Sequence, residues 1–258
     1  MDLFAPGAAT TMVLLAFRVG GMMLIAPVFT SRTIPMMVRA ALLVLLSWLM
    51  HPVAMANVGV PVLTPATALS ESLVGFAIGF GAALLVGAAE AMGDLLAVQT
   101  GLSGAAALDP LTNHSVPVLG QFANLFAVAL LLSVNAHIVM LEAIAATLEM
   151  IPVGSAIEMQ AGVGAMIAIA SDLFYFGLRF AAPVIAVVLI ANVAMAVLGR
   201  VAPQLNILAV AFPMQIGLGL FTFATVIPLI ATFFTDWTTP YGSMLNQVMD
   251  AFTSGGGR

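Results

Sequence analysis

Long apolar runs are the feature that most constrains how this chain can fold. A helix needs about 20 predominantly apolar residues to cross the hydrocarbon of a bilayer. With 62% hydrophobic and only 7% charged residues, the chain cannot make the surface of a soluble domain. The sequence therefore predicts an all-α integral membrane protein with about six apolar helical zones. These zones are 7–29, 36–55, 69–89, 119–141, 161–199 and 205–234.

Prolines interrupt the last two zones. The fifth zone is nearly twice the length of one crossing and has Pro183 near its middle, where a missing N–H donor kinks or breaks a helix. It is either two helices or one long bent helix. The sixth zone contains Pro213 and Pro228, which are tolerated where neighbouring groups satisfy the freed backbone. The tail, residues 236–258, ends in a Gly-rich stretch and is expected to be frayed and flexible.

Charge and motif content exclude several classes of function. All six basic residues are arginines and the formal net charge is −5, so no basic patch for nucleic acid is present in the sequence. The chain has no cysteine, which removes disulfides and thiol chemistry. The three histidines have no metal-ligand spacing, and there is no P-loop, nucleophile elbow or dinucleotide fingerprint. The sequence predicts a protein that is not an enzyme and that needs no metal or cofactor.

Arg18 lies near the centre of the first apolar zone. A basic side chain there costs about 2.5–3.5 kcal/mol even on the lenient insertion scale. We expect it to contact a carboxylate or carbonyl on another helix or subunit. The alternative is that it extends toward an interface.

Other charged residues occupy apolar zones or their ends. Asp172 and Arg179 are seven residues apart on one helix face, and each is expected to face protein or water rather than lipid. Glu90 and Asp94 are at i and i+4, a like-charged pair at the mouth of the third connection. A solvated helix end is the favoured interpretation of this pair, and a cation or proton site is the alternative.

Small residues recur every four positions along the third zone. Gly75, Gly79, Ala83 and Gly87 form a smooth stripe that permits close approach of another helix, with Glu71 one turn before it. The stripe predicts dense helix packing at these four residues.

The third connection, about residues 100–118, has the composition of neither a helix nor a solvated linker. Gly101, Gly104 and Pro110 oppose a long helix, while the remaining residues are mostly small and apolar. Irregular backbone at membrane depth is tolerated only where it is buried in protein or lines water. A re-entrant segment or plug and a plain surface loop remain equal alternatives on the residues alone.

Several motifs occur together in a fixed order. In this order they resemble the family of flagellar FliR and its injectisome counterpart SctT, over about residues 16–230. The motifs are Arg18 with Pro27-Val28-Phe29, Ile34-Pro35 and Arg39, then Glu71, Gly75, Gly79 and Phe80, then Gln99-Thr100-Gly101 through Asp109-Pro110, then Ala182-Pro183, Gly199-Arg200-Val201-Ala202-Pro203-Gln204-Leu205-Asn206, and Pro213 with Gly217.

The resemblance implies a structural, pore-forming subunit of the type III secretion export gate. It implies a single membrane domain with a FliP-like part over 1–160, a FliQ-like hairpin over 161–235 and the tail 236–258. Within it, the central segment would be a plug loop that closes the channel until an unfolded substrate passes. The residues assigned to this plug are Gly101, Gly104, Leu108, Asp109, Pro110 and Asn113.

The turn of the hairpin is expected in the cytoplasm, because Arg32, Arg39 and Arg200 then share the positive side. The turn residues are Gly199, Arg200, Pro203, Gln204 and Asn206. Partner contacts within the membrane are expected at Arg18, Arg39, Glu71, Asp172 and Arg179.

The implied partners are FliP-like and FliQ-like subunits around one copy of this chain. FlhB-like and FlhA-like export proteins, exported unfolded substrates and membrane lipid complete the set, with no nucleic acid. The implied location is the bacterial inner membrane at the flagellar basal body, and flagellum is favoured over injectisome. Some apolar zones would then pack against partner helices rather than lipid.

Two other classes of function remain open. In a small secondary transporter, Arg18, Glu71, Asp172 and Arg179 would line a substrate or proton path, although no convincing inverted repeat is visible in the sequence. A purely structural scaffold fits the composition but leaves the Gly- and Pro-interrupted third connection unexplained.

Overall fold

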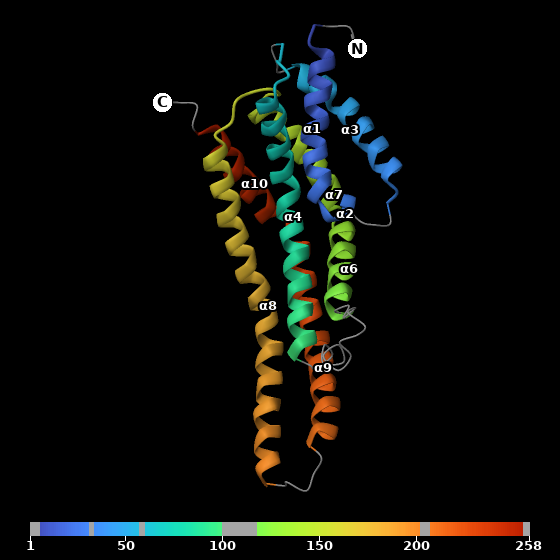
Figure 1. Ribbon diagram of the computed structural model, residues 1–258, viewed down its shortest axis with the longest axis vertical. Coiled ribbons are helices and arrows are strands. Elements are labelled where there is room, and N and C mark those ends of the chain that lie inside the picture. Colours follow the sequence, from blue (N-terminus) through green and yellow to red (C-terminus); the bar gives the residue numbers. More distant parts are fainter. Residues whose placement is uncertain (1–5, 31–33, 57–59, 100–117, 202–206, 255–258) are drawn as a thin grey trace. The chain divides into compact units, whose positions relative to one another are not determined.

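A computed structural model describes residues 6–30, 34–56, 60–99, 118–201 and 207–254 of the protein. All regular elements in these ranges are α-helices, so the expected all-α class is confirmed (Figure 1). They are α1 (Ala8–Ile25), α2 (Pro27–Thr30), α3 (Met36–Ala56), α4 (Pro65–Gln99), α6 (Val118–Ser133), α7 (Ala136–Met150), α8 (Met159–Val201), α9 (Ile207–Thr235) and α10 (Thr238–Thr253).

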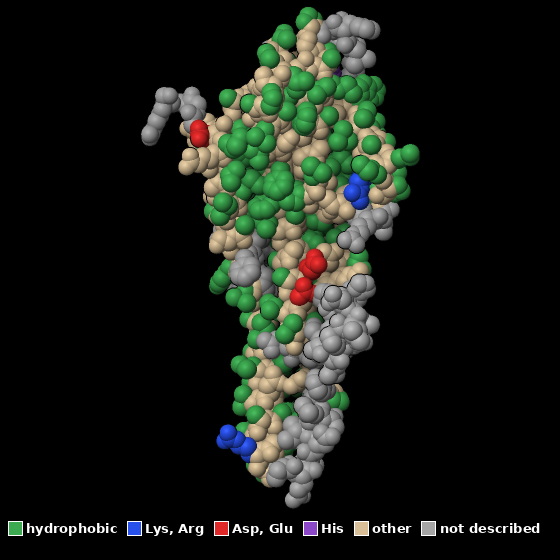
Figure 2. Space-filling model, in the orientation of Figure 1, with side chains coloured by type: hydrophobic (Ala, Val, Ile, Leu, Met, Phe, Trp, Pro, Cys, Tyr) green, Lys and Arg blue, Asp and Glu red, His purple; other side chains and the backbone are tan. Residues whose placement is uncertain are grey.

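Five helices in the described ranges are long and apolar enough to cross a membrane, or six if α6 and α7 count as one broken span. The five are α1, α3, α4, the second half of α8, and α9. Figure 2 shows hydrophobic side chains over much of the visible face, with few charged ones. This surface suits lipid or other apolar helices and does not suit water.

Three predicted zones differ from the helices observed. The first zone, 7–29, is divided at Ala26 into α1 and α2. The third zone, 69–89, becomes the longer helix α4, because Leu85, Val86, Met92 and Leu96 continue its buried face. The fourth zone, 119–141, is interrupted between α6 and α7. Asn135 lies there in the left-handed conformation at φ 56°, which an α-helix interior does not accommodate.

Pro183 leaves the fifth zone continuous. α8 runs from Met159 to Val201 with Pro183 inside it, so the one-helix alternative describes the structure. α9 likewise contains Pro213 and Pro228, as the sequence predicts for the sixth zone. Proline inside an apolar helix leaves a backbone carbonyl without its usual N–H donor, and neighbouring helices, polar side chains, water or local adjustment of the helix can satisfy it.

The chain divides into two compact units, and the first is made of residues 1–84, 131–171 and 237–258. In this unit α1 and α3 lie side by side and run in opposite directions (Figure 1). Their contact with α7 encloses a core of Leu14, Leu15, Ala54, Leu148 and Val153. His51 of α3 is buried, and its Nε2 lies 3.2 Å from the backbone oxygen of Ala8.

The second unit contains residues 85–130 and 172–236. Here α8 pairs with α9, and the Gln215 side chain donates a hydrogen bond to Oδ1 of Asn192 across the pair. The ring of Phe122 in α6 makes an edge contact with Phe223 of α9, with centroids 6.2 Å apart. A polar bond between apolar helices fixes their register more sharply than nonpolar packing alone.

The expectation of a frayed tail over 236–258 is wrong for Thr238–Thr253, which form α10. Its buried residues, Tyr241, Val248, Met249 and Phe252, recur at helical spacing and face the first unit. The Tyr241 hydroxyl donates to the backbone oxygen of Ile78 at 2.8 Å, and burial raises the pKa of this hydroxyl. The Gly-rich stretch on which that expectation rests follows α10 in the sequence and is not part of this amphipathic helix.

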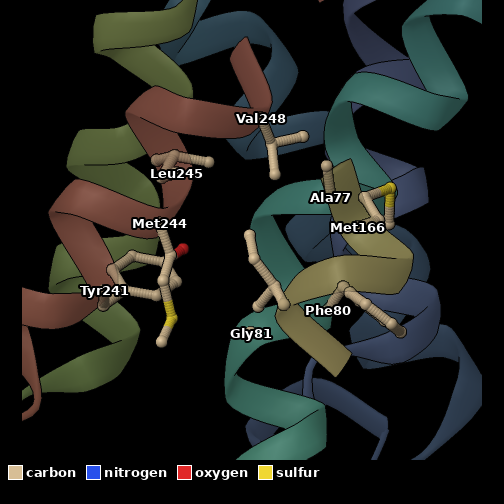
Figure 3. Close-up of a pocket in the computed structure, with 9 residues that line it drawn as sticks. Ala77, Phe80, Gly81, Met166, Tyr241, Met244, Leu245 and Val248 are labelled. Carbon is tan, nitrogen blue, oxygen red and sulfur yellow. The ribbon is translucent and has the colours of Figure 1, made fainter. Parts of the chain in front are cut away.

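Figure 3 shows how α10 faces its neighbours. Met244 and Leu245 of α10, Gly81 of α4 and Met166 of α8 line a small apolar cavity of about 20 Å³. This space is little more than a packing gap and too small for an organic ligand. The inner face of α10 is therefore a packing surface.

Truncating Phe252 should release α10 from the first unit. Its ring is buried against Gly162, and its backbone oxygen accepts a hydrogen bond from the Glu158 amide at 2.8 Å. We expect Phe252→Ala to cost about 3–5 kcal/mol of local stability, because it leaves a cavity. Hydrogen exchange of residues 238–253 measures the effect, with exposed Gln247→Ala as the control. Equal protection in both variants would contradict this docking.

Candidate functional site

Helices α1 and α4 approach each other so closely that glycine is required at their contact. A Cβ on Gly75 would overlap the backbone oxygen of Arg18, and one on Gly21 would overlap that of Ser72. At Gly79 a Cβ would lie 2.7 Å from the backbone oxygen of Met22. Close backbone packing through small residues is a characteristic mode of helix association in membranes.

Beside this contact, Arg18 of α1 forms an ion pair with Glu71 of α4. The Arg18 Nε donates to Glu71 Oε2 at 2.6 Å. The two side chains are 0% and 2% exposed, so the pair is enclosed by protein. Arg18 thus has the carboxylate partner on another helix that its position in an apolar zone requires.

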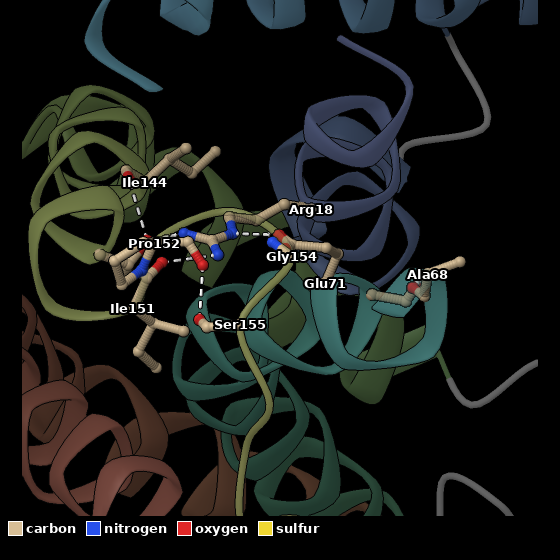
Figure 4. Close-up of polar contacts among 10 residues, drawn as sticks. Arg18, Ala68, Glu71, Ile144, Ile151, Pro152, Gly154 and Ser155 are labelled. Atoms are coloured by element: carbon tan, nitrogen blue, oxygen red, sulfur yellow. Dashed lines mark hydrogen bonds and ion pairs between the residues drawn. The ribbon is translucent and has the colours of Figure 1, made fainter. Parts of the chain in front are cut away.

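The pair is completed by groups at the end of α7. The Arg18 Nη2 donates to the backbone oxygen of Ile151 at 2.9 Å, and Nη1 lies 3.4 Å from the Thr147 hydroxyl oxygen. The backbone N–H of Gly154 donates to Glu71 Oε1 at 2.8 Å. Figure 4 shows the guanidinium between the carboxylate and the turn that follows α7. One network therefore ties together α1, α4 and the end of α7.

Gly154 shapes the turn that delivers its amide to Glu71. Its φ is +83°, in the region that side chains disfavour, and a Cβ there would lie 2.8 Å from the Cβ of Pro61. Sequence reasoning missed Gly154, Thr147 and Ile151. The Ile151-Pro152-Val153-Gly154 run is a turn signal, but nothing in it indicates a carboxylate partner.

Enclosure limits what this network can do chemically. Two buried opposite charges with hydrogen-bonded partners hold helices in one arrangement, and breaking either partner is strongly unfavourable. The described residues cover both side chains almost completely, so neither charge is exposed to solvent there. The geometry is that of a structural lock between helices.

The small-residue stripe is only partly a contact surface. Gly75 and Gly79 pack as the sequence predicts, and Ala83 is half-buried. The prediction of close packing is wrong for Gly87. A Cβ there would meet nothing within 4 Å, because this side of α4 is exposed. In the second unit the close approach instead uses Gly93, where a Cβ would lie 2.6 Å from the backbone oxygen of Leu119.

Glu90 and Asp94 do not lie at the end of a helix, because α4 continues to Gln99. The Asn124 side chain of α6 donates to Glu90 Oε2 at 2.7 Å. Asp94 packs against Gly120, and its Oδ1 is buried with no hydrogen bond among the described residues. The pair therefore lies within α4 and not at a helix end, which corrects that part of the favoured interpretation, and both residues are half-buried.

The structure places the other predicted residues separately. Arg39 is half-buried at the start of α3, where its Nη2 donates to the backbone oxygen of Thr30 at 3.2 Å. Asp172 and Arg179 lie on α8, but their side chains are outside the description. Gly199 and Arg200 lie in the last turn of α8, and Arg200 is exposed.

Two predicted sites fall outside the described residues. They are the plug residues Gly101, Gly104, Leu108, Asp109, Pro110 and Asn113, and the turn residues Pro203, Gln204 and Asn206. Among the residues that the structure does describe, no three acidic or histidine side chains gather as metal ligands.

The chain matches the family described as bacterial export proteins, family 1, over residues 9–240. It is 31% identical to the flagellar biosynthetic protein FliR of Escherichia coli strain K12 over 219 residues, 84% of each chain. It is 30% identical to the protein of that name from Pectobacterium carotovorum over 89% of this chain and 88% of the relative. The FliR of Caulobacter vibrioides is 26% identical over 98% of this chain and its whole length.

Removing one charge of the buried pair should be far worse than removing both. We expect Arg18→Leu to insert into the membrane normally but to lose about 3–5 kcal/mol of stability, because Glu71 is left buried and uncompensated. Adding Glu71→Gln should recover part of that loss. Thermal unfolding in detergent measures both variants against Arg200→Leu, which removes an exposed arginine. An unchanged midpoint in the single variant would contradict the lock.

Alanine should destabilise the protein at Gly75 but not at Gly87, although both belong to one stripe. Gly75→Ala forces α1 and α4 apart and should destabilise by about 1–3 kcal/mol, as overpacking does. Gly87→Ala meets open space and should be neutral or stabilising by up to about 1 kcal/mol through helix propensity. Thermal unfolding of the two variants checks the difference. Equal destabilisation would show that Gly87 is also closely packed.

Proposed function

Because the chain belongs to the bacterial export proteins, family 1, we propose that it is a structural, pore-forming subunit of the flagellar export gate. The observation that carries the proposal is the family match over residues 9–240, which covers nearly all the described helices. The relatives reported above are named flagellar biosynthetic protein FliR, and this supports flagellum over injectisome.

The apolar helices support a role as wall elements of a channel. The Arg18–Glu71 network fixes α1, α4 and α7 against one another, so these helices form a stable part of such a wall. A subunit of this kind guides unfolded substrates and performs no covalent step. The buried charges then stabilise the wall and do not touch the cargo.

The division of the chain into a FliP-like part over 1–160 and a FliQ-like hairpin over 161–235 remains part of the proposal. The pairing of α8 with α9 through Asn192 and Gln215 supports the hairpin. The proposed FliP-like part must also account for α10, because this helix belongs to the first unit although it follows the hairpin in the sequence. The segment around 100–118 is proposed as the plug.

Exposed apolar helix faces support the proposed partners. Leu189, Ile190 and Val193 of α8 are largely exposed, as is Phe221 of α9. We assign such faces to FliP-like and FliQ-like subunits and to lipid of the inner membrane at the basal body. FlhB-like and FlhA-like proteins and the unfolded substrates complete the proposed assembly.

A secondary transporter is less well supported by the geometry. Its path would need Arg18 and Glu71 to face water or substrate, whereas both are enclosed and bonded to each other. Ionisable residues on a transport path normally line an accessible cavity.

Deleting residues 104–114 from the chain should open the assembled gate. We expect the variant to co-purify with FliP-like and FliQ-like subunits as the parent does, because no described helix is shortened. Ion leakage through the reconstituted complex should rise, since the proposed plug is absent. A scrambled 104–114 segment of equal composition is the matched control for the loss of chain length.

Two results would contradict the proposal separately. Failure of the parent chain to co-purify with those subunits would count against gate membership. Unchanged conductance in an intact complex would count against the plug alone.

A further inference from the structure

The break between α6 and α7 lies in a stretch of sequence that favours an unbroken helix. No glycine or proline occurs from Gln121 to Ile151, so the residue types that most often end or kink a helix are absent. The sequence accordingly predicts one apolar zone over 119–141, long enough to cross a membrane. α6 alone has 16 residues and is about 24 Å long, shorter than a hydrocarbon core of about 30 Å. The cause of the break therefore lies in tertiary contacts rather than in the local sequence.

The backbone at the break has a conformation that is unfavourable for a residue with a side chain. Asn135 has φ 56° and ψ 31°, in the left-handed region, and its side chain makes no hydrogen bond that caps α7. Two residues later, Nδ1 of His137 is buried without a hydrogen-bond partner among the described residues. An unbroken helix would remove the left-handed residue. It would also give carbonyl partners to the first N–H groups of α7, which have none within that helix.

Polar contacts far from the break hold each of the two helices. α7 is held in the first unit, where Arg18 donates to the backbone oxygen of Ile151 directly after the helix. α6 is held in the second unit, where the Asn124 side chain donates to Glu90 Oε2 at 2.7 Å. The close approach of the α6 backbone to Gly93 of α4 adds to this second anchor. The broken form therefore depends on contacts of the two helices elsewhere, since the sequence at the break favours a helix.

We propose that α6 and α7 alternate between this broken pair and one continuous helix, with Asn135 as the switch residue. Leu132 and Ile138 beside the break are 44% and 45% exposed, so little packing resists a change of direction there. A continuous helix over residues 118–150 is about 50 Å long at 1.5 Å per residue. In the proposed gate it would be a wall helix of two lengths. That use rests on the proposed function, whereas the switch itself does not.

The distance between two spin labels tests the proposal. The chain has no cysteine, so Gln121→Cys on α6 and Glu149→Cys on α7 provide two unique labelling sites, and both positions are exposed. The full chain is assembled with cysteine-free partner subunits in nanodiscs and measured by double electron–electron resonance. The two labelled residues lie about 42 Å apart along a continuous helix and closer together across a break.

Substitutions at Asn135 should shift the population between the two forms. Alanine favours the helix and disfavours the left-handed conformation, so Asn135→Ala should raise the population at about 42 Å about tenfold. Glycine suits the left-handed conformation and weakens a helix, so Asn135→Gly should retain only the shorter distance. Asn246→Ala, at an exposed asparagine of α10, is the matched control. Identical distance distributions in Asn135→Ala and Asn135→Gly would overturn the proposal.

Releasing one anchor gives a second test that leaves the break itself unchanged. Asn124→Ala removes the hydrogen bond to Glu90, so the population at the longer distance should rise. If Asn135→Ala does not assemble, an unchanged distribution in Asn124→Ala overturns the proposal.

The same distances measured on the isolated chain in nanodiscs separate the switch from gate membership. A shift of population in a chain that does not co-purify with the partner subunits would support the switch and contradict only the proposed function.

Discussion

The need to satisfy one arginine in an apolar helix governs the arrangement of the first unit. Arg18 is fully covered, so its charge must be met by protein groups rather than by water. Glu71 supplies the charge and the Ile151 carbonyl supplies a further acceptor. Since these groups come from α4 and from the end of α7, satisfying Arg18 fixes three segments of the chain at once.

The glycines of α1 and α4 make that arrangement possible. An ion pair as short as 2.6 Å between two packed helices requires their backbones to be near each other. Gly75 lies one turn after Glu71, and its missing side chain leaves room for the Arg18 carbonyl. The ion pair determines which faces of the two helices meet, and the glycines allow the two backbones to come close. Neither feature alone would fix the helices as well.

The sequence predicts which residues of this site need a partner, because a charge in an apolar helix is unfavourable by itself. It does not predict which residues, distant in the sequence, supply the contacts. Arg18 in the middle of an apolar zone predicts a partner, and the glycine stripe predicts the close approach of another helix. Neither feature identifies which helix that is. Gly154 and Ile151 act through backbone groups, which carry no residue-specific signal. Spacing predicts equal packing at Gly75 and Gly87, yet only tertiary structure decides which of them meets a neighbour. The Gly-rich end of the chain predicts fraying, but the residues before it have an amphipathic pattern and form α10.

Enclosed charges and exposed apolar surfaces have different roles in this molecule. Charges that lie within the bundle, as Arg18 and Glu71 do, are matched inside the chain and make it rigid. The apolar faces of α3, including Trp48 and Leu49, remain exposed and require an apolar environment. Arg39 lies where these two situations meet, half-buried at the end of a span and beside an apolar groove. Its Nη2 donates to the backbone oxygen of Thr30, so this charge too is met in part by groups of the chain itself.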